Sequence, residues 1–201
     1  VARMLFLKNY QVEVFLFNVT GQLSEECLTN IRRLKESGFP NYTEVSSQFQ
    51  APKLTEHDIV VDGLFGSGLN RPLNGGFAAV VKFINASPAT VVSIDVPSGL
   101  MGEDNTHNIR QNIIKANLTL SIQLPKLSFL FAENADVVGE WQLLDIGISR
   151  EFIESAKTNY YITEASEMRA LIKPRKKFAH KGMFGHGLLI AGSYGMGGAA
   201  L

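Results

Sequence analysis

The 201-residue sequence has little cysteine, no excess of charge and no long apolar run. Its one cysteine, Cys27, excludes an internal disulfide and fits a reducing compartment, so we expect a cytoplasmic protein. The 19 basic and 19 acidic side chains cancel, so no global field draws the chain to nucleic acid or to a membrane. No apolar stretch reaches the roughly 20 residues of a membrane span. What remains, 45% hydrophobic and 19% charged residues, is typical of a globular protein.

Several functional signatures are missing as well. The four histidines show no metal-binding spacing with one another or with Cys27, and we interpret them as surface or linker residues. The glycine-rich stretch Gly66–Pro72 has Arg71 where a dinucleotide fingerprint needs its third glycine, and no P-loop lysine follows it. A nicotinamide dehydrogenase is therefore disfavoured. The first residues show neither a signal peptide nor an initiator methionine, and the sequence begins as if within a helix.

Two aspartates carry the strongest positive signal. Asp62 and Asp95 lie 33 residues apart, and each follows an apolar run that breaks into glycine. About thirty residues is the length of one strand–helix–parallel strand unit, so both carboxylates are expected at the carboxyl edge of a sheet, where ligands bind. Paired strands lie about 4.8 Å apart. Two acids this close predict a cation site, an acid/base site, or both, although each can also cap its own turn.

Apolar periodicity predicts the fold around these residues. Strands alternate with helices, which favours an α/β protein: a three-layer α/β/α sandwich with a Rossmann-like, doubly wound, mostly parallel sheet. The predicted helices cover residues 1–8, 24–37 and 77–85. The predicted strands cover residues 12–17, 43–45, 59–62, 90–95, 118–122 and 140–147.

Other residues are placed at the same sheet edge by this pattern. The loop Gly66–Pro72 joins a strand to a helix, which is the context for cradling a phosphate, and Arg71 can grip a phosphate with two hydrogen bonds. Its plainer interpretation is an ordinary connection, but the whole loop, Phe65–Gly76, is long for one. Ser98 follows Asp95 by three residues, and carboxylate, hydroxyl and carbonyl oxygens form the ligand set of a hard cation. Lys126 follows a predicted strand and falls at this edge too.

The alternation of predicted strands and helices ends in the last part of the chain. The basic run 173–181 is interpreted as a linker, because no aromatic interleaving supports nucleic-acid binding. A new strand is predicted over Gly187–Gly192, then a glycine loop, then a helix starting at Ala199. We therefore expect the sequence to end just inside a second domain.

Four segments together resemble the NAD(P)HX epimerase domain of the YjeF N-terminal type: Val61–Leu69, Ser93–Gly99, Leu124–Lys126 and Leu144–Ile148. Two later segments, His180–His186 and Ile190–Ser193, resemble the opening of the ADP-dependent NAD(P)HX dehydratase, a ribokinase-like domain. The resemblance implies an epimerase-like domain over 1–149, a connecting segment over 150–179, and the incomplete start of a dehydratase domain over 180–201. It also implies that the family's Asn-Asn-Gly-Gly-Asp loop lies just before residue 1.

The resemblance implies an isomerase that repairs nicotinamide cofactors by interconverting the R and S forms of hydrated NADH or NADPH. In the full-length protein this would be coupled to ADP-dependent dehydration by a lyase, which needs ADP or ATP and Mg²⁺. Asp62 and Ser98 would hold a potassium ion, K⁺, and Asp95 would contact the hydrated ring as the candidate acid/base. The substrate's phosphates and ribose would meet the loop residues Gly66, Ser67, Gly68, Leu69, Asn70, Arg71 and Pro72.

The same resemblance leaves one alternative open. The domain can instead be a non-catalytic scaffold of this fold that binds a ligand, a protein or RNA. For the enzyme we expect a small-molecule substrate, no membrane or nucleic-acid partner, and a homo-oligomer.

Overall fold

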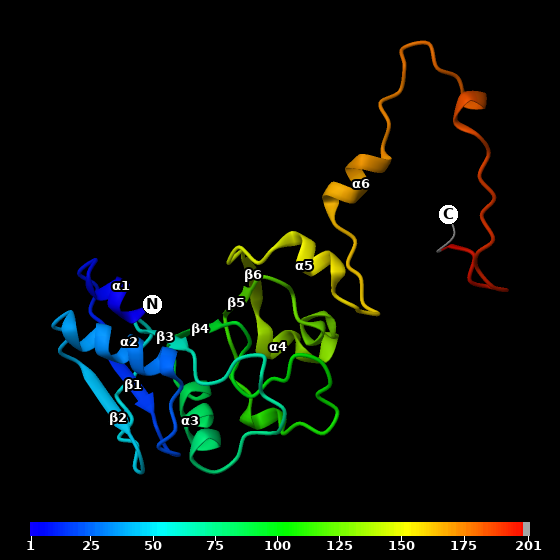
Figure 1. Cartoon of the computed structure of the whole chain (residues 1–201). Helices are drawn as coiled ribbons and strands as arrows, with labels where there is room; N and C mark the ends of the chain where they lie inside the picture. Colours follow the sequence, from blue (N-terminus) through cyan, green and yellow to red (C-terminus); the bar gives the residue numbers. More distant parts are fainter. Residues whose placement is uncertain (199–201) are drawn as a thin grey trace. The chain divides into compact units, whose positions relative to one another are not determined.

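The computed structural model describes residues 1–198, which separate into two compact units, Val1–Arg150 and the residues from Glu151 onward. The first unit holds every strand assigned in the described residues (Figure 1). Its elements run in this order: α1 (Ala2–Phe6), β1 (Val14–Phe17), α2 (Glu25–Glu36), β2 (Tyr42–Val45), β3 (Ile59–Asp62), α3 (Gly75–Asn85), β4 (Thr90–Ile94), η1 (Arg110–Asn112), β5 (Leu118–Ile122), η2 (Leu127–Leu130), η3 (Ala132–Asn134), α4 (Ala135–Val138) and β6 (Glu140–Leu144).

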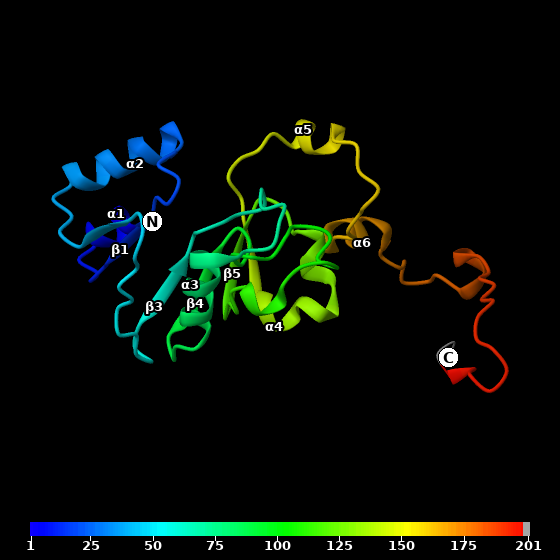
Figure 2. The same cartoon turned by 90° about the horizontal axis from the view of Figure 1, so that it is seen from below.

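All strand pairs are parallel, which confirms the α/β, Rossmann-like class. Hydrogen bonds join the strands into two groups, a β1–β2 pair and a four-stranded sheet in the order β3-β4-β5-β6, rather than into one sheet. Both views show the β1–β2 pair with α1 and α2 beside the larger sheet (Figure 2). Aromatic packing makes the connection, because Phe17 of β1 lies 6.3 Å from Phe77 of α3 between ring centroids.

The local signals at helix ends act as expected. The Ser24 hydroxyl caps α2 by accepting a hydrogen bond from the Cys27 amide at 3.2 Å. Gly38 follows the helix with φ +74°, a conformation that glycine adopts without strain. Cys27 itself is a free thiol, half-buried on α2.

Two apolar clusters anchor the four-stranded sheet. One joins α3 to β4 and consists of Leu73, Val80, Val81, Ile84, Val91 and Ile114. The other surrounds α4 and η2 and consists of Val96, Leu100, Ile113, Phe129, Val137 and Val138. Val96 and Leu100 flank Ser98, so the loop after β4 is held by core packing at both ends.

Gly99 makes the closest backbone approach in that loop. It has φ +100°, and a Cβ built there would lie 2.9 Å from the Ile113 Cα and still closer to the Asn112 carbonyl oxygen. We expect Gly99→Ala to lower the free energy of unfolding by about 3 kcal/mol or more, since backbone strain and overpacking add. Urea unfolding measures this. The control Gly102→Ala, where nothing lies within 4 Å of an added Cβ, should change stability by less than about 1 kcal/mol. Equal losses in both variants would contradict the steric argument.

The second unit carries little regular structure. It includes α6 (Ala165–Leu171) and η4 (Lys181–Phe184), while α5 (Arg150–Ser155) begins at the boundary. The strand predicted over Gly187–Gly192 is wrong: these residues form none, and Leu188 and Ile190 are each 87% exposed. A strand needs a partner, and the described residues offer it no neighbour. The helix predicted from Ala199 lies outside the described residues.

In the part of the chain that the structure describes, no helix is long and apolar enough to cross a membrane.

Candidate functional site

The two aspartates lie at the carboxyl ends of neighbouring strands. Asp62 is the last residue of β3, Asp95 comes directly after β4, and these strands pair in parallel with Asp62 opposite Ser93. This is the edge at which open α/β sheets bind ligands. The two carboxylates nevertheless differ in their burial and in their hydrogen-bond partners.

Asp62 is the centre of a buried hydrogen-bond cluster. Its side chain is 2% exposed, and four donors reach its carboxylate. Oδ1 accepts from the Ser98 hydroxyl at 2.5 Å and the Leu64 amide at 3.4 Å, while Oδ2 accepts from the Ser93 hydroxyl and the Ser98 amide, each at 2.8 Å. Such charge-assisted bonds are the strong ones. Asp62 therefore ties the end of β3 to the end of β4.

Asp95 sits at the centre of a tight turn with an unusual backbone. Its φ is +71°, and the Val96 amide donates to the Ile94 carbonyl at 2.9 Å, two residues back. This is the pattern of a classic γ-turn, which is rare and strained. Residues held in strained backbone conformations cluster at functional sites. The turn takes Asp95 out of the strand and turns its side chain toward the loop after β3.

Both oxygens of Asp95 have partners from neighbouring segments. The Lys126 ammonium lies 2.9 Å from Oδ1, which is shielded from solvent, and the Ser67 amide donates to Oδ2 at 2.9 Å. Burial alone raises the pKa of the Asp95 carboxyl, but the hydrogen bonds from Lys126 and Ser67 and the charge of Lys126 outweigh it. The pKa is therefore held below its ordinary value, and Asp95 is a carboxylate at neutral pH.

The loop Gly66–Pro72 begins against this carboxylate. A Cβ on Gly66 would lie 3.0 Å from Asp95 Oδ2, so only glycine leaves that oxygen uncrowded. The Phe65 amide donates to the Ser98 hydroxyl at 2.9 Å, which ties the loop to the buried cluster. The middle of the loop faces solvent, with Ser67, Gly68, Asn70 and Arg71 exposed. Leu69 instead packs against the α3 cluster, and Pro72 is half-buried.

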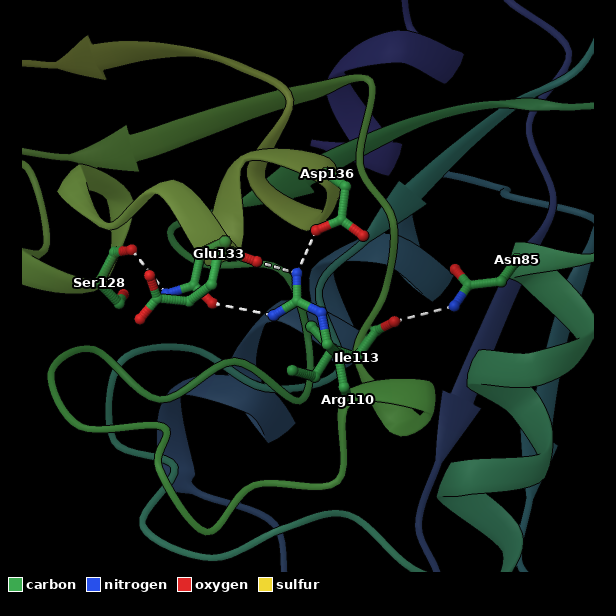
Figure 3. A network of polar contacts seen from close by, with 7 residues as sticks. Asn85, Arg110, Ile113, Ser128, Glu133 and Asp136 are labelled. Carbon is green, nitrogen blue, oxygen red and sulfur yellow. Dashed lines mark hydrogen bonds and ion pairs between the residues drawn. The ribbon is translucent and has the colours of Figure 1, made fainter.

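A second network holds the segment behind Ser98 and Gly99. The Ile114 amide donates to the Ser98 carbonyl at 2.9 Å, so η1 and the residues after it back onto the site. Figure 3 shows Arg110 of η1 reaching the Glu133 carbonyl and the Asp136 carboxylate, while Asn85 of α3 donates to the Ile113 carbonyl at 2.8 Å. These contacts fix η1 to α3 and to the η3–α4 turn.

Sequence reasoning missed two participants. The strand pattern alone gives Ser93 no role, although its side chain is fully buried and donates to Asp62. The ion pair of Lys126 with Asp95 was missed too, since Lys126 was placed only at the sheet edge. A usable signal exists: Ser121-Ile122-Gln123-Leu124-Pro125 repeats the pattern of Ser93-Ile94-Asp95-Val96-Pro97, so the two strands end alike.

The oxygen atoms around Ser98 fit an alkali cation in kind. Ser98 Oγ lies 2.5 Å from Asp62 Oδ1 and 3.3 Å from the Phe65 carbonyl oxygen, so a carboxylate, a hydroxyl and a carbonyl converge. This is the hard-oxygen donor set that such ions take. No group of three or more His, Cys, Asp or Glu side chains able to hold a metal occurs among residues 1–198.

With this geometry in view, the comparisons with known proteins define first the class and then the family. The fold matches the crystal structure of yeast ynu0, YNL200c, with a TM-score of 0.54 and 20% identity, over 83% of this chain and 68% of that one. Residues 1–128 match the family described as YjeF-related protein N-terminus. The chain belongs to this family.

Two curated relatives show how the match is distributed. The bifunctional NAD(P)H-hydrate repair enzyme Nnr of Thermofilum pendens is 33% identical over 100% of this chain and 37% of its own length. The NAD(P)H-hydrate epimerase of Oenococcus oeni is 31% identical over 74% of this chain and 67% of its own length. The chain thus spans well under half of the bifunctional relative and two thirds of the single-function one.

Proposed function

We propose that this protein epimerises hydrated NADH and NADPH, interconverting the R and S forms during repair of nicotinamide cofactors. The observation that carries the proposal is the Asp95 carboxylate, held ionised beside the glycine loop at the carboxyl edge of the sheet. The names of the relatives supply the substrate class. A half-buried carboxylate next to a strand-to-helix loop supplies the chemistry that this substrate needs.

The proposed chemistry acts on the ring carbon next to nitrogen N1, which carries the added hydroxyl. The bond from this carbon to the hydroxyl oxygen breaks as the N1 lone pair forms a C=N bond. The oxygen takes one proton from solvent and leaves as water. Water then adds to the opposite face and releases one proton, so the cycle balances. Asp95 stabilises the positively charged ring and takes up the released proton.

The two carboxylate oxygens of Asp95 divide this work. Oδ1 is inaccessible to solvent and contacts Lys126, whereas Oδ2 accepts a hydrogen bond from the Ser67 amide and faces the space left by Gly66. Oδ2 is therefore the oxygen that meets the substrate. A side chain at position 66 would close this approach.

The exposed part of the loop is proposed to bind the phosphates. It leads into α3, whose first turn has no side-chain cap, so its amide groups are available to an anion. Arg71 adds an exposed guanidinium group that can form two hydrogen bonds to a phosphate.

Arg71→Ala should raise KM by roughly tenfold or more with kcat nearly unchanged, because a phosphate contact is equal in ground and transition states. The control Arg33→Ala, on exposed α2, should leave both constants as they were; a fall in kcat alone would contradict the assignment.

K⁺ is proposed at the buried cluster, held by the Asp62 carboxylate and the Ser98 hydroxyl with the Phe65 carbonyl nearby. A bound cation would supply fixed positive charge beneath the loop. Held by Asp62 and Ser98, that charge would lie between the ends of β3 and β4, near the turn that carries Asp95.

The test of the proposal is direct. The full-length polypeptide is incubated with unequal R and S hydrates, and the isomer ratio is followed by chromatography. Movement toward the equilibrium ratio is expected. An unchanged ratio, together with tight binding of RNA or a protein, would favour the non-catalytic scaffold instead.

Two wider expectations stay proposals. Residues 180–201 are proposed to begin the dehydratase part of a bifunctional enzyme, supported by the match of the Thermofilum pendens enzyme across the entire chain. The homo-oligomer stays a prediction.

A further inference from the structure

The turns after β4 and β5 are built alike. Asp95 has φ +71° and Gln123 has φ +62°, and each is spanned by a hydrogen bond between the residues on either side, 2.9 Å in the first turn and 2.7 Å in the second. A proline follows each turn one residue later, and the next position is Ser98 in the first turn and Lys126 in the second. Lys126 is thus the counterpart of Ser98, the residue that ties the first turn to Asp62.

The Lys126 ammonium contacts three oxygen atoms. Its Nζ donates to the carbonyl oxygens of Ile122 at 3.0 Å and Leu124 at 3.2 Å, and it contacts Asp95 Oδ1 at 2.9 Å. Two of the three ammonium protons are therefore used in hydrogen bonds to backbone carbonyls, and the contact with Asp95 is an ion pair. The first two acceptors flank Gln123, and the third belongs to the neighbouring turn. Lys126 therefore joins the two turns through a single nitrogen.

This ion pair differs from an ordinary surface salt bridge. The side chains of Lys126 and Asp95 are 16% and 13% exposed, so water screens the pair weakly. Exposed pairs contribute little because two long side chains must be ordered for one contact. Here the lysine is already ordered by two backbone carbonyls, and the aspartate by its turn and by Ser67.

We propose that Lys126 is a positioning residue of the epimerase site, which holds Asp95 by Oδ1 so that Oδ2 faces the hydrated ring. The inference rests on the proposed function and goes beyond it by assigning a role to a residue outside both aspartate segments. Lys126 acts through Asp95, because its ammonium contacts the Asp95 carboxylate and two backbone carbonyl oxygens.

The test compares two substitutions in the full-length polypeptide. Lys126→Met keeps the length of the side chain but removes its charge and donors. We expect kcat to fall about 10²-fold, the lower end of what acid–base assistance contributes, with KM nearly unchanged. The acid limb of the rate profile should move to higher pH, because the charged group that lowers the pKa of Asp95 is gone and only the hydrogen bonds from Ser67 remain. Lys126→Arg keeps the charge, so the acid limb should stay and kcat should recover in part.

Lys115→Met serves as the matched control, since Lys115 is exposed just before β5. Normal kcat and an unmoved acid limb in Lys126→Met would overturn the proposal. An arginine variant as slow as the methionine variant would overturn it as well, because it would make Lys126 a proton donor to substrate. Should the wild type itself fail to epimerise, the proposed function fails separately. Crystal structures of wild type and Lys126→Met then decide the positioning role: displacement of the Asp95 carboxylate supports it, and an unmoved carboxylate refutes it.

Discussion

Asp95→Asn is expected to slow epimerisation of the hydrates by about 10²–10⁴-fold, the range that a positioned acid/base contributes. The amide is nearly isosteric but cannot take up a proton at neutral pH. Asparagine also tolerates φ +71° better than most residues, so the turn should survive. The remaining side-chain oxygen can still contact Lys126. The new NH₂ group then faces the Ser67 N–H, and because both are donors, no hydrogen bond forms between them. We therefore expect a stability loss of about 1–3 kcal/mol but a folded protein.

The pH dependence gives this prediction a second readout. The pKa of Asp95 is held below its ordinary value, so the carboxylate is present at neutral pH and is lost as pH falls through that pKa. Wild-type activity should decline on the acid side, and the stability from the Lys126 pair should decline over the same range. The residual activity of Asp95→Asn should lack this limb.

Asp58→Asn is a suitable control for this substitution. Asp58 lies just before β3, at the opposite end of that strand from the site, and its carboxylate bonds to Thr55. Its pKa is also lowered, by hydrogen bonds from Thr55, so the control substitutes an aspartate of similar titration behaviour. Near-normal kcat in Asp95→Asn would show that Asp95 only positions the substrate, and the proposed chemistry would then be wrong.

How much of the fold and the site could be predicted depends on whether the interactions are local in the sequence or join distant residues. The ends of β3 and β4 were predictable because apolar runs and glycine are local signals, and a thirty-residue spacing implies parallel neighbours. Ser98 was expected beside Asp62 as a cation ligand; the structure shows that it also donates to Asp62 through both its amide and its hydroxyl. The contact of Ser93 with Asp62 needed the strand register, which composition does not reveal.

Longer-range arrangements were not predictable from pattern alone. Whether β1 joins the larger sheet by hydrogen bonds to β3 or by aromatic packing against α3 depends on side chains far apart in sequence. The run Gly187–Gly192 reads as a strand because it is apolar, yet no partner is described for it. Lys126 pairs with Asp95 because the parallel pairing of β4 with β5 places their turns next to each other, and each turn has a residue with positive φ.

The second large effect is expected at Asp62. Asp62→Asn replaces one acceptor oxygen by an NH₂ group in a cluster where four donors converge. If the NH₂ group takes the Oδ2 position, it opposes both the Ser93 hydroxyl and the Ser98 amide; if it takes the Oδ1 position, it opposes the Ser98 hydroxyl and the Leu64 amide. Either way at least one buried donor loses its acceptor and the remaining bonds lose their charge. We expect unfolding free energy to fall by about 3 kcal/mol.

Urea unfolding with potassium and with lithium at equal ionic strength separates the structural from the cation role of Asp62. A ligand that binds only the native state raises stability by mass action, so the wild type should gain stability in potassium. Asp62→Asn should be less stable than the wild type in lithium and should gain no stability in potassium. The control Asp104→Asn changes an exposed residue and keeps the turn bond to Thr106. It should lose less than about 1 kcal/mol of unfolding free energy and keep the gain in potassium. If the wild type is equally stable to urea in potassium and in lithium, the four-donor cluster has only a structural role. The protein donors then satisfy the Asp62 carboxylate, and no cation is needed.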